Sequence, residues 1–183
     1  AGTCYYIAQD TEITLTNEQI AAQGTQQTCN AGENEAKLNN ITTTTSAWYM
    51  AVVVKDAAGN VSDILSITIP APTYIISAEP TQLNFESKAD GYTEPPAAQT
   101  VTITNTGNQR VTVDLPASTN YTITAGEGFE TTSAVLAPNG TATFTVQPVT
   151  GLGVGTYGET LSISGSNNTS AEGSLAFTVE PKS

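Results

Sequence analysis

The chain has 183 residues, of which 17 are acidic and 5 are basic, so that its net charge is -12 at neutral pH. Such a surface repels phosphate backbones, and no basic stripe with interleaved aromatic residues is present, which excludes nucleic acid as a partner. No apolar run approaches the roughly 20 residues that span a bilayer, so we expect no membrane insertion. The absence of histidine removes the commonest general base and metal ligand, which argues against an enzyme.

Most segments of the chain alternate apolar and polar residues with period two and are rich in Thr, Val, Ile and Tyr. This pattern predicts short strands separated by Gly, Pro and Asn turns, as in antiparallel sheets with one apolar face. The strands are expected at residues 5–8, 48–54, 64–69, 100–105, 110–115, 121–125, 141–146, 159–164 and 174–179. We therefore predict an all-β fold made of β-sandwiches.

The chain contains two cysteines, Cys4 and Cys29, which lie 25 residues apart. They form no CxxC pair, and without histidine or further cysteines they form no zinc site. We expect a disulfide in an oxidising compartment, which contributes about 3.5 kcal/mol through loop closure. Two buried free thiols are the alternative.

One short helix is predicted near residues 16–24, within the stretch LTNEQIAAQG. Thr16 is placed to be the N-cap, with Gln19 as its capping-box partner. Gly24 is placed to close the C-terminus. All the local signals agree, so a helix is expected here in spite of its length.

Residues 47–70 predict a strand, a tight turn and a returning strand. On the first strand, every second side chain from the only tryptophan onwards is large and apolar, which we interpret as the core face. That face consists of Trp48, Met50, Val52 and Val54. The opposite face, which includes Tyr49, is expected to point outwards.

The turn KDAAGNVSD, at residues 55–63, gathers oxygen-bearing side chains around Gly59. Asp56, Asn60 and Asp63 are weak candidates for calcium ligands, because calcium takes 6 to 8 oxygens and this loop offers only two carboxylates without the DxDxDG spacing. Asp and Asn also cap their own backbone in turns, and Gly tolerates positive φ. We therefore interpret the stretch as a hairpin corner and expect no metal and no cofactor.

The hairpin with its KDAAGNVS turn resembles the last two strands of fibronectin type III-like modules in bacterial secreted and cell-surface proteins. The resemblance implies a partial β-sandwich over residues 1–71, in which AGTCYYIAQD is strand C and strands A and B are absent. Trp48 stands where the family has a corner tyrosine. We expect the chain to begin inside a domain, and the exposed half-core to favour pairing with a second chain.

Pro70 and Pro72 cannot donate to a ladder, and they predict a boundary followed by a second module at residues 72–183. Three segments of this module resemble immunoglobulin-like domains of the ASPM/SPD-2/hydin type and their bacterial relatives. They are VTITNTGNQRVTV, LAPNGTATFTVQP and GLGVGTYGETLSISGS. The predicted strands are enough for a seven-stranded sandwich, and Tyr157, at the start of its strand, is placed to be the corner tyrosine. The resemblance implies no catalytic residues. The predicted core consists of Leu136, Phe144, Val146, Leu161, Ile163, Leu175, Phe177 and Val179.

The residues and both resemblances favour a non-catalytic spacer or adhesion module of a larger secreted or surface-anchored bacterial protein, located outside the cell. Its partner would be a protein or a glycan. The alternative is a carbohydrate-binding accessory region of an extracellular enzyme, which needs exposed aromatic rings to stack on sugars. The possible ligand-facing aromatics are Tyr49, Tyr74, Tyr92 and Tyr121.

Overall fold

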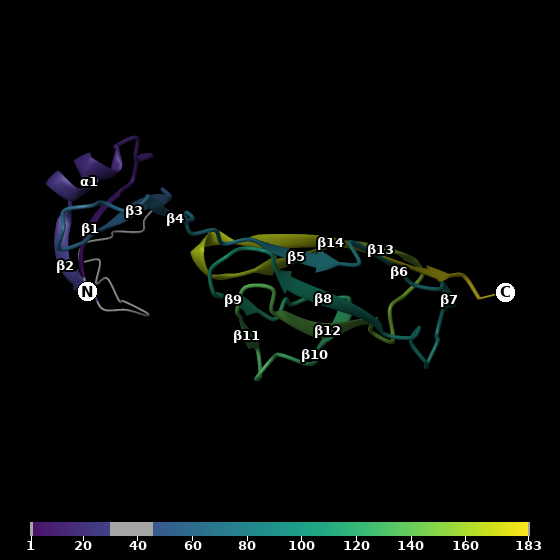
Figure 1. Cartoon of the computed structure of the whole chain (residues 1–183). Coiled ribbons are helices and arrows are strands. Elements are labelled where there is room, and N and C mark those ends of the chain that lie inside the picture. Colours follow the sequence, from purple (N-terminus) through teal and green to yellow (C-terminus); the bar gives the residue numbers. More distant parts are fainter. Residues whose placement is uncertain (1, 30–45, 183) are drawn as a thin grey trace. The chain divides into compact units, whose positions relative to one another are not determined.

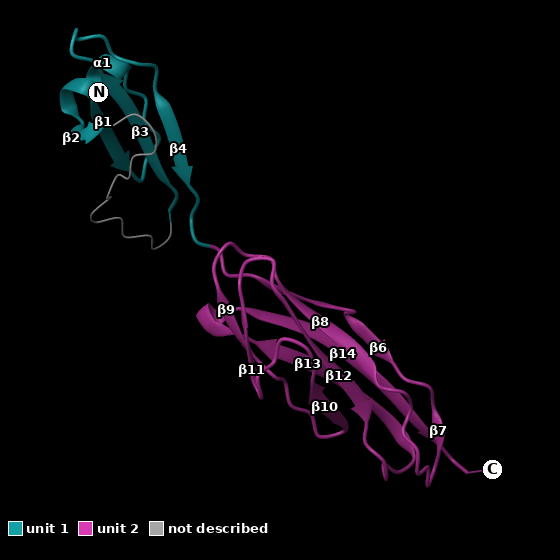
Figure 2. Cartoon of the chain, turned by 60° about the horizontal axis from the view of Figure 1, so that its bottom comes forward, with its two compact units in different colours: residues 1–72 teal, residues 73–183 magenta. Residues whose placement is uncertain are grey.

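The structure, a computed structural model, describes residues 2–29 and 46–182. The chain divides into two compact units, residues 1–72 and 73–183 (Figure 2), and the division lies beside the two prolines at which a boundary was expected. The described elements are strands apart from one α-helix and one short 3-10 helix, so the prediction of an all-β fold is confirmed. Among the described residues, no helix is long and apolar enough to cross a membrane.

The described residues of unit 1 form an antiparallel sheet with the strand order β2-β1-β3-β4 (Figure 1). Its strands are β1 (Gly2–Gln9), β2 (Thr25–Cys29), β3 (Trp48–Lys55) and β4 (Leu65–Ile69). The helix α1 (Asn17–Gln23) packs against β1 and β3. The sheet is therefore covered by a helix on one of its faces.

The helix α1 begins and ends where the sequence predicts. The Gln19 N–H donates to Thr16 Oγ1 over 3.3 Å, and the Thr16 N–H donates to Gln19 Oε1 over 2.8 Å, which completes the capping box. At the other end the Gly24 N–H donates to the carbonyl of Ile20. Ile20 is fully buried and anchors the helix on the sheet.

The predicted core face of β3 is wrong. The structure buries Ala51 and Val53, which pack with Ile20 of α1, whereas Val54 is 40% exposed. Tyr5 and Ile7 of β1 lie opposite Val53 and Ala51 and extend the same packed face. The physical reason is that both faces of β3 are apolar, and the position of α1 decides which of them is covered.

Unit 2 is a sandwich of sheets around one core. One sheet has the order β10-β12-β8-β5. Its strands are β5 (Ile76–Glu79), β8 (Gln99–Asn105), β10 (Tyr121–Ala125) and β12 (Thr141–Pro148). All its neighbouring strands are antiparallel.

The opposite side of the sandwich is built around a long hairpin of β13 (Gly155–Ser164) and β14 (Ser170–Glu180). On the other edge of β14 lie β6 (Gln82–Asn84) and β7 (Lys88–Ala89), and both run parallel to β14. The N-terminal segment of unit 2 therefore pairs directly with its C-terminal strand.

The remaining elements of unit 2 are a two-stranded antiparallel sheet and the 3-10 helix. The small sheet pairs β9 (Val111–Asp114) with β11 (Ser133–Leu136), and η1 (Ser166–Asn168) lies in the turn between β13 and β14. Residues 73–182 thus contain ten strand segments where seven strands were expected. Part of the difference arises because the first strand is divided into β5, β6 and β7.

The core of unit 2 follows the period-two pattern of its strands. All eight side chains predicted for it are buried, with at most 2% of their surface exposed. Side chains from β5, β6, β8, β9 and β10 belong to the same cluster. Burying alternate residues from both sheets is the main stabilising contribution in a sandwich of this kind.

Candidate functional site

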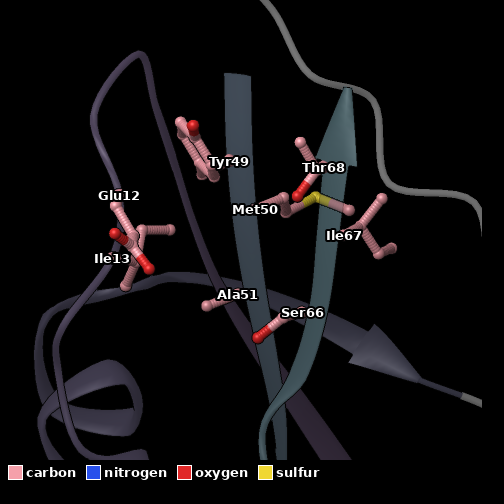
Figure 3. A pocket seen from close by; sticks show the side chains of 8 residues that line it. All are labelled: Glu12, Ile13, Tyr49, Met50, Ala51, Ser66, Ile67 and Thr68. Atoms are coloured by element: carbon pink, nitrogen blue, oxygen red, sulfur yellow. The ribbon is translucent and has the colours of Figure 1, made fainter. Parts of the chain in front are cut away.

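A pocket of about 150 Å³ opens on the helix-bearing side of unit 1, between β3, β4 and the loop that follows β1 (Figure 3). Tyr49, Ala51, Ser66 and Thr68 share this side of the sheet, whereas Met50 and Ile67 belong to the opposite side and reach the pocket between the strands. The loop contributes two neighbouring residues. The lining consists of Glu12, Ile13, Tyr49, Met50, Ala51, Ser66, Ile67 and Thr68. Tyr49 is the one predicted ligand-facing aromatic that the structure places in this pocket.

This pocket, which we call the Tyr49 pocket, has an apolar floor and a polar rim. Ala51 is buried and forms part of the floor, and Tyr49 lies opposite Thr68 in the strand register. Ser66 and Thr68 add exposed hydroxyl groups, and Glu12 adds an exposed carboxylate. An aromatic ring beside hydroxyls and a carboxylate suits a small polar ligand such as one sugar ring. The volume lies below the ~300–1,000 Å³ typical of ligand sites.

The candidate calcium ligand Asp56 is already used by its own turn. Its carboxylate accepts hydrogen bonds from the Ala58 N–H (2.9 Å), the Asn60 N–H (2.9 Å) and the Asn60 side-chain amide (2.8 Å). These bonds, the Asn60 side-chain bond above all, hold the pKa of Asp56 below its ordinary value. Gly59 adopts φ 95°, as the corner of a tight turn requires.

A metal site at this turn finds no support in the described residues. Asp63 does not join the cluster around Asp56; instead its carbonyl accepts a hydrogen bond from the Ser62 hydroxyl. In the described parts of the chain, no group of three or more Cys, Asp and Glu side chains is arranged to hold a metal ion. The geometry around Asp56 and Asn60 is that of a hairpin corner.

The two cysteines lie on neighbouring strands of unit 1. Cys4 is in β1 and Cys29 ends β2, and the structure joins them in a disulfide with their Cα atoms 5.7 Å apart. This separation is typical of disulfides. The bond ties together two strands that are already paired along the sheet.

The other three aromatic candidates lie in unit 2 and do not form a site. The prediction that Tyr121 faces a ligand is wrong, because its side chain is only 3% exposed and its hydroxyl donates to the Tyr157 carbonyl. Tyr92 is half-buried, donates to the carbonyl of Val149 and places its ring edge-on against Phe177. Tyr74 is 38% exposed.

Tyr121 belongs to a polar network that the sequence did not reveal. Its hydroxyl lies 2.5 Å from the Tyr157 carbonyl oxygen, and burial, with a smaller contribution from Glu159, raises its pKa to about 12. Glu159, which shares the parity of the buried Leu161 on β13, accepts a hydrogen bond from the Ser118 hydroxyl over 2.8 Å. Tyr157 is a corner tyrosine as expected, since its hydroxyl donates to the Gly153 carbonyl over 2.8 Å.

Asn105 is the second polar residue that sequence reasoning missed. It is fully buried at the end of β8, and its amide nitrogen donates to the carbonyls of Gln109 (2.7 Å) and Leu136 (3.0 Å). Its side-chain oxygen accepts from the Gly107 N–H over 3.0 Å. A Cβ on Gly107 would lie 2.3 Å from the Thr73 carbonyl oxygen, so this turn requires glycine.

Comparison with known proteins gives only distant similarities. No family model and no curated protein matches the chain. Among solved structures, the ASH/PapD-like domain 7 of human CEP192 has a TM-score of 0.43 at 12% identity, covering 59% of this chain and 87% of that one. A protein of unknown function from Porphyromonas gingivalis W83 has a TM-score of 0.41 at 11% identity, covering 98% of this chain and 86% of that one. The D00-D0 domain of intimin has a TM-score of 0.35 at 18% identity, covering 97% of this chain and 86% of that one.

Proposed function

We propose that the chain is a non-catalytic spacer that transmits mechanical force within a larger extracellular, surface-anchored protein. The observation that carries this proposal is the parallel pairing of β6 and β7, near the N-terminal end of unit 2, with its last strand β14. β6 and β7 enter unit 2 from its N-terminal side, and β14 leaves it at the C-terminal side. The resemblance of both modules to bacterial surface modules supports a spacer or adhesion role.

The backbone bonds between these strands extend along the C-terminal half of β14. The Ser174 N–H donates to the Thr81 carbonyl (2.8 Å), and the Phe85 N–H donates to the Ala176 carbonyl (2.9 Å). The Asp90 N–H donates to the Glu180 carbonyl over 2.8 Å. A further contact joins the side chains of Ser87 and Glu180 over 2.9 Å. We refer to these paired segments, residues 81–90 and 174–180, as the terminal clamp.

The terminal clamp would resist a pulling force because its two segments run parallel to one another. When the two ends of unit 2 are pulled apart, the segment 81–90 is drawn one way and β14 the other, along their common axis. The parallel bonds are then loaded together and must break together. A pair of strands pulled apart from one end opens one bond at a time, which requires less force. Forced unfolding depends on the height of this barrier rather than on the equilibrium stability.

Single-molecule pulling on the full chain, held at its two ends, tests the proposal. We expect unit 2 to unfold in one step at a high force. The variant Asp90→Pro removes one clamp donor, because proline has no N–H, and should lower that force. The matched control Asp90→Ala keeps the N–H and should leave the force unchanged. Equal unfolding forces for the wild type and Asp90→Pro would contradict the role of the clamp.

Carbohydrate binding is the second candidate, and the Tyr49 pocket is the observation that favours it. A glycan array probed with the full chain should then show retention that Tyr49→Ala abolishes. Tyr74→Ala, which removes an exposed tyrosine in the other unit, is the matched control and should keep the retention. Binding that persists in Tyr49→Ala would exclude this pocket as the site.

A further inference from the structure

On β1, β3 and β4, the face of the unit 1 sheet that is directed away from α1 carries mainly apolar side chains. The strand register places these residues side by side on β1, β3 and β4. We call them the apolar face: Tyr6, Ala8, Trp48, Met50, Val52, Val54, Leu65, Ile67 and Ile69. None of them belongs to the buried cluster of unit 1.

Three of the nine side chains of the apolar face are exposed, and the other six are half-buried. Leu65 is 61% exposed, and Val54 and Ile67 are 40% and 39% exposed. With strands ~4.8 Å apart and a rise of ~3.3 Å per residue, three strands of this length span roughly 300–400 Å² in projection. An apolar patch of this size is comparable to the largest patch on a typical soluble monomer, about 300–600 Å², and such patches often mark interaction sites.

We propose that the apolar face is the interface of a homodimer, in which the sheets of two copies pack face to face. The face itself is uncharged and can therefore accept a second copy as the occupant. Each chain carries a net charge of -12, yet none of the nine side chains in the apolar face is charged. Two such faces can therefore meet without placing acidic side chains opposite one another, and a two-fold axis makes the same patch serve both copies.

Size and spacing agree with a dimer of moderate affinity. Counted as accessible surface from both copies, the patch is on the order of 1,000 Å², the lower limit for a specific interface. Two sheets pack at about 10 Å with interdigitating side chains, as they do within a sandwich. The dimer would complete for unit 1 the second layer that the described residues do not supply. This inference is independent of the spacer role.

Light scattering and tryptophan fluorescence of the full chain test the proposal together. With increasing concentration, the molar mass should rise from 18.9 kDa towards twice that value. Trp48 is the only tryptophan of the chain and lies on the apolar face, so its emission reports on this surface alone. Its emission should shift to shorter wavelengths, and its quenching by acrylamide should fall, over the same range of concentration.

Substitutions on the two sides of β4 locate the interface. Leu65→Glu and Ile67→Glu place a charge on the apolar face and should weaken dimerisation by at least about tenfold. Ser66→Glu and Thr68→Glu add the same charge on the opposite side of the same strand and should leave the dimer intact. Far-UV circular dichroism confirms folding, which we expect to persist because Leu65 is largely exposed.

Three outcomes would overturn the inference. The first is a monomeric mass at every concentration with Trp48 open to acrylamide, which means that the face stays uncovered. The second is a monomeric mass with Trp48 shielded, which means that the chain covers its own sheet. The third is a dimer that Leu65→Glu leaves intact, which places the interface elsewhere.

Discussion

At the scale of single residues, the buried amide of Asn105 joins three segments of unit 2. It donates to carbonyls of the following turn and of β11 and accepts from the Gly107 N–H. Every one of these partners is a backbone group, so the side chain substitutes for main-chain pairing where β8 ends. A buried polar side chain is tolerated in a core only when it is satisfied in this way.

Replacing Asn105 with Asp should therefore destabilise unit 2. The new oxygen would face two carbonyl oxygens to which the amide nitrogen now donates, inside the core. We expect a loss of about 2–4 kcal/mol in the free energy of unfolding, measured by urea denaturation. Asn84→Asp makes the same chemical change at an exposed position and should cost less than about 0.5 kcal/mol. Equal effects of the two substitutions would contradict this role.

The turn around Asp56 gives a prediction about pH. Because hydrogen bonds from Asn60 and Ala58 lower the folded-state pKa of Asp56 below 3.8, its contribution to stability is present above that pH. The contribution is lost as the pH falls through the lowered pKa. Carbon-13 NMR titration of the carboxyl group should show the low pKa in the wild type and a rise towards 3.8 in Asn60→Ala. An unchanged pKa in that variant would be evidence against the turn geometry.

These two residues show what the sequence reveals at this scale. The spacing of Asp56, Gly59 and Asn60 predicts a turn because all its hydrogen bonds are local. Asn105 lies in TNTGN, which looks like any polar hairpin turn, and its importance depends on a contact with Leu136, 31 residues away. A role of this kind is set by tertiary packing and leaves no local pattern.

At the scale of elements, α1 was predictable and the face that it covers was not. Thr16, Gln19 and Gly24 mark the ends of the helix through contacts with near neighbours. The strand β3 is apolar on both faces, and period two alone cannot distinguish them. The burial of Ala51 and Val53 follows from the position of Ile20, which no pattern within β3 encodes.

The disulfide between β1 and β2 should stabilise unit 1 alone. Reduction, or the pair of substitutions Cys4→Ser and Cys29→Ser, should lower its free energy of unfolding by about 3.5 kcal/mol through the freedom gained by the unfolded chain. Trp48 fluorescence reports this transition selectively, because unit 2 contains no tryptophan. The unfolding of unit 2, which contains no cysteine, is the internal control. An unchanged Trp48 transition after reduction would contradict a stabilising disulfide.

At the scale of the whole molecule, the division beside Pro70 and Pro72 could be foreseen from the chemistry of proline. Most of the strands β13 and β14 could also be foreseen, because both alternate clearly, although their pairing as a long hairpin was not predicted. The terminal clamp could not, since β6 and β7 have only three and two residues and their register depends on β14. The feature that supports the proposed function is thus set by topology.

The spacer role is tested most directly by changing the direction of force on unit 2. In one geometry the full chain is held at its two ends, which shears the terminal clamp. In the other it is held at Val154→Cys, an exposed position just before β13, and at the C-terminus, which opens the β13–β14 pair from the end at which Gly155 meets Val179. We predict a clearly higher unfolding force in the first geometry. An equal or lower force there would contradict the account.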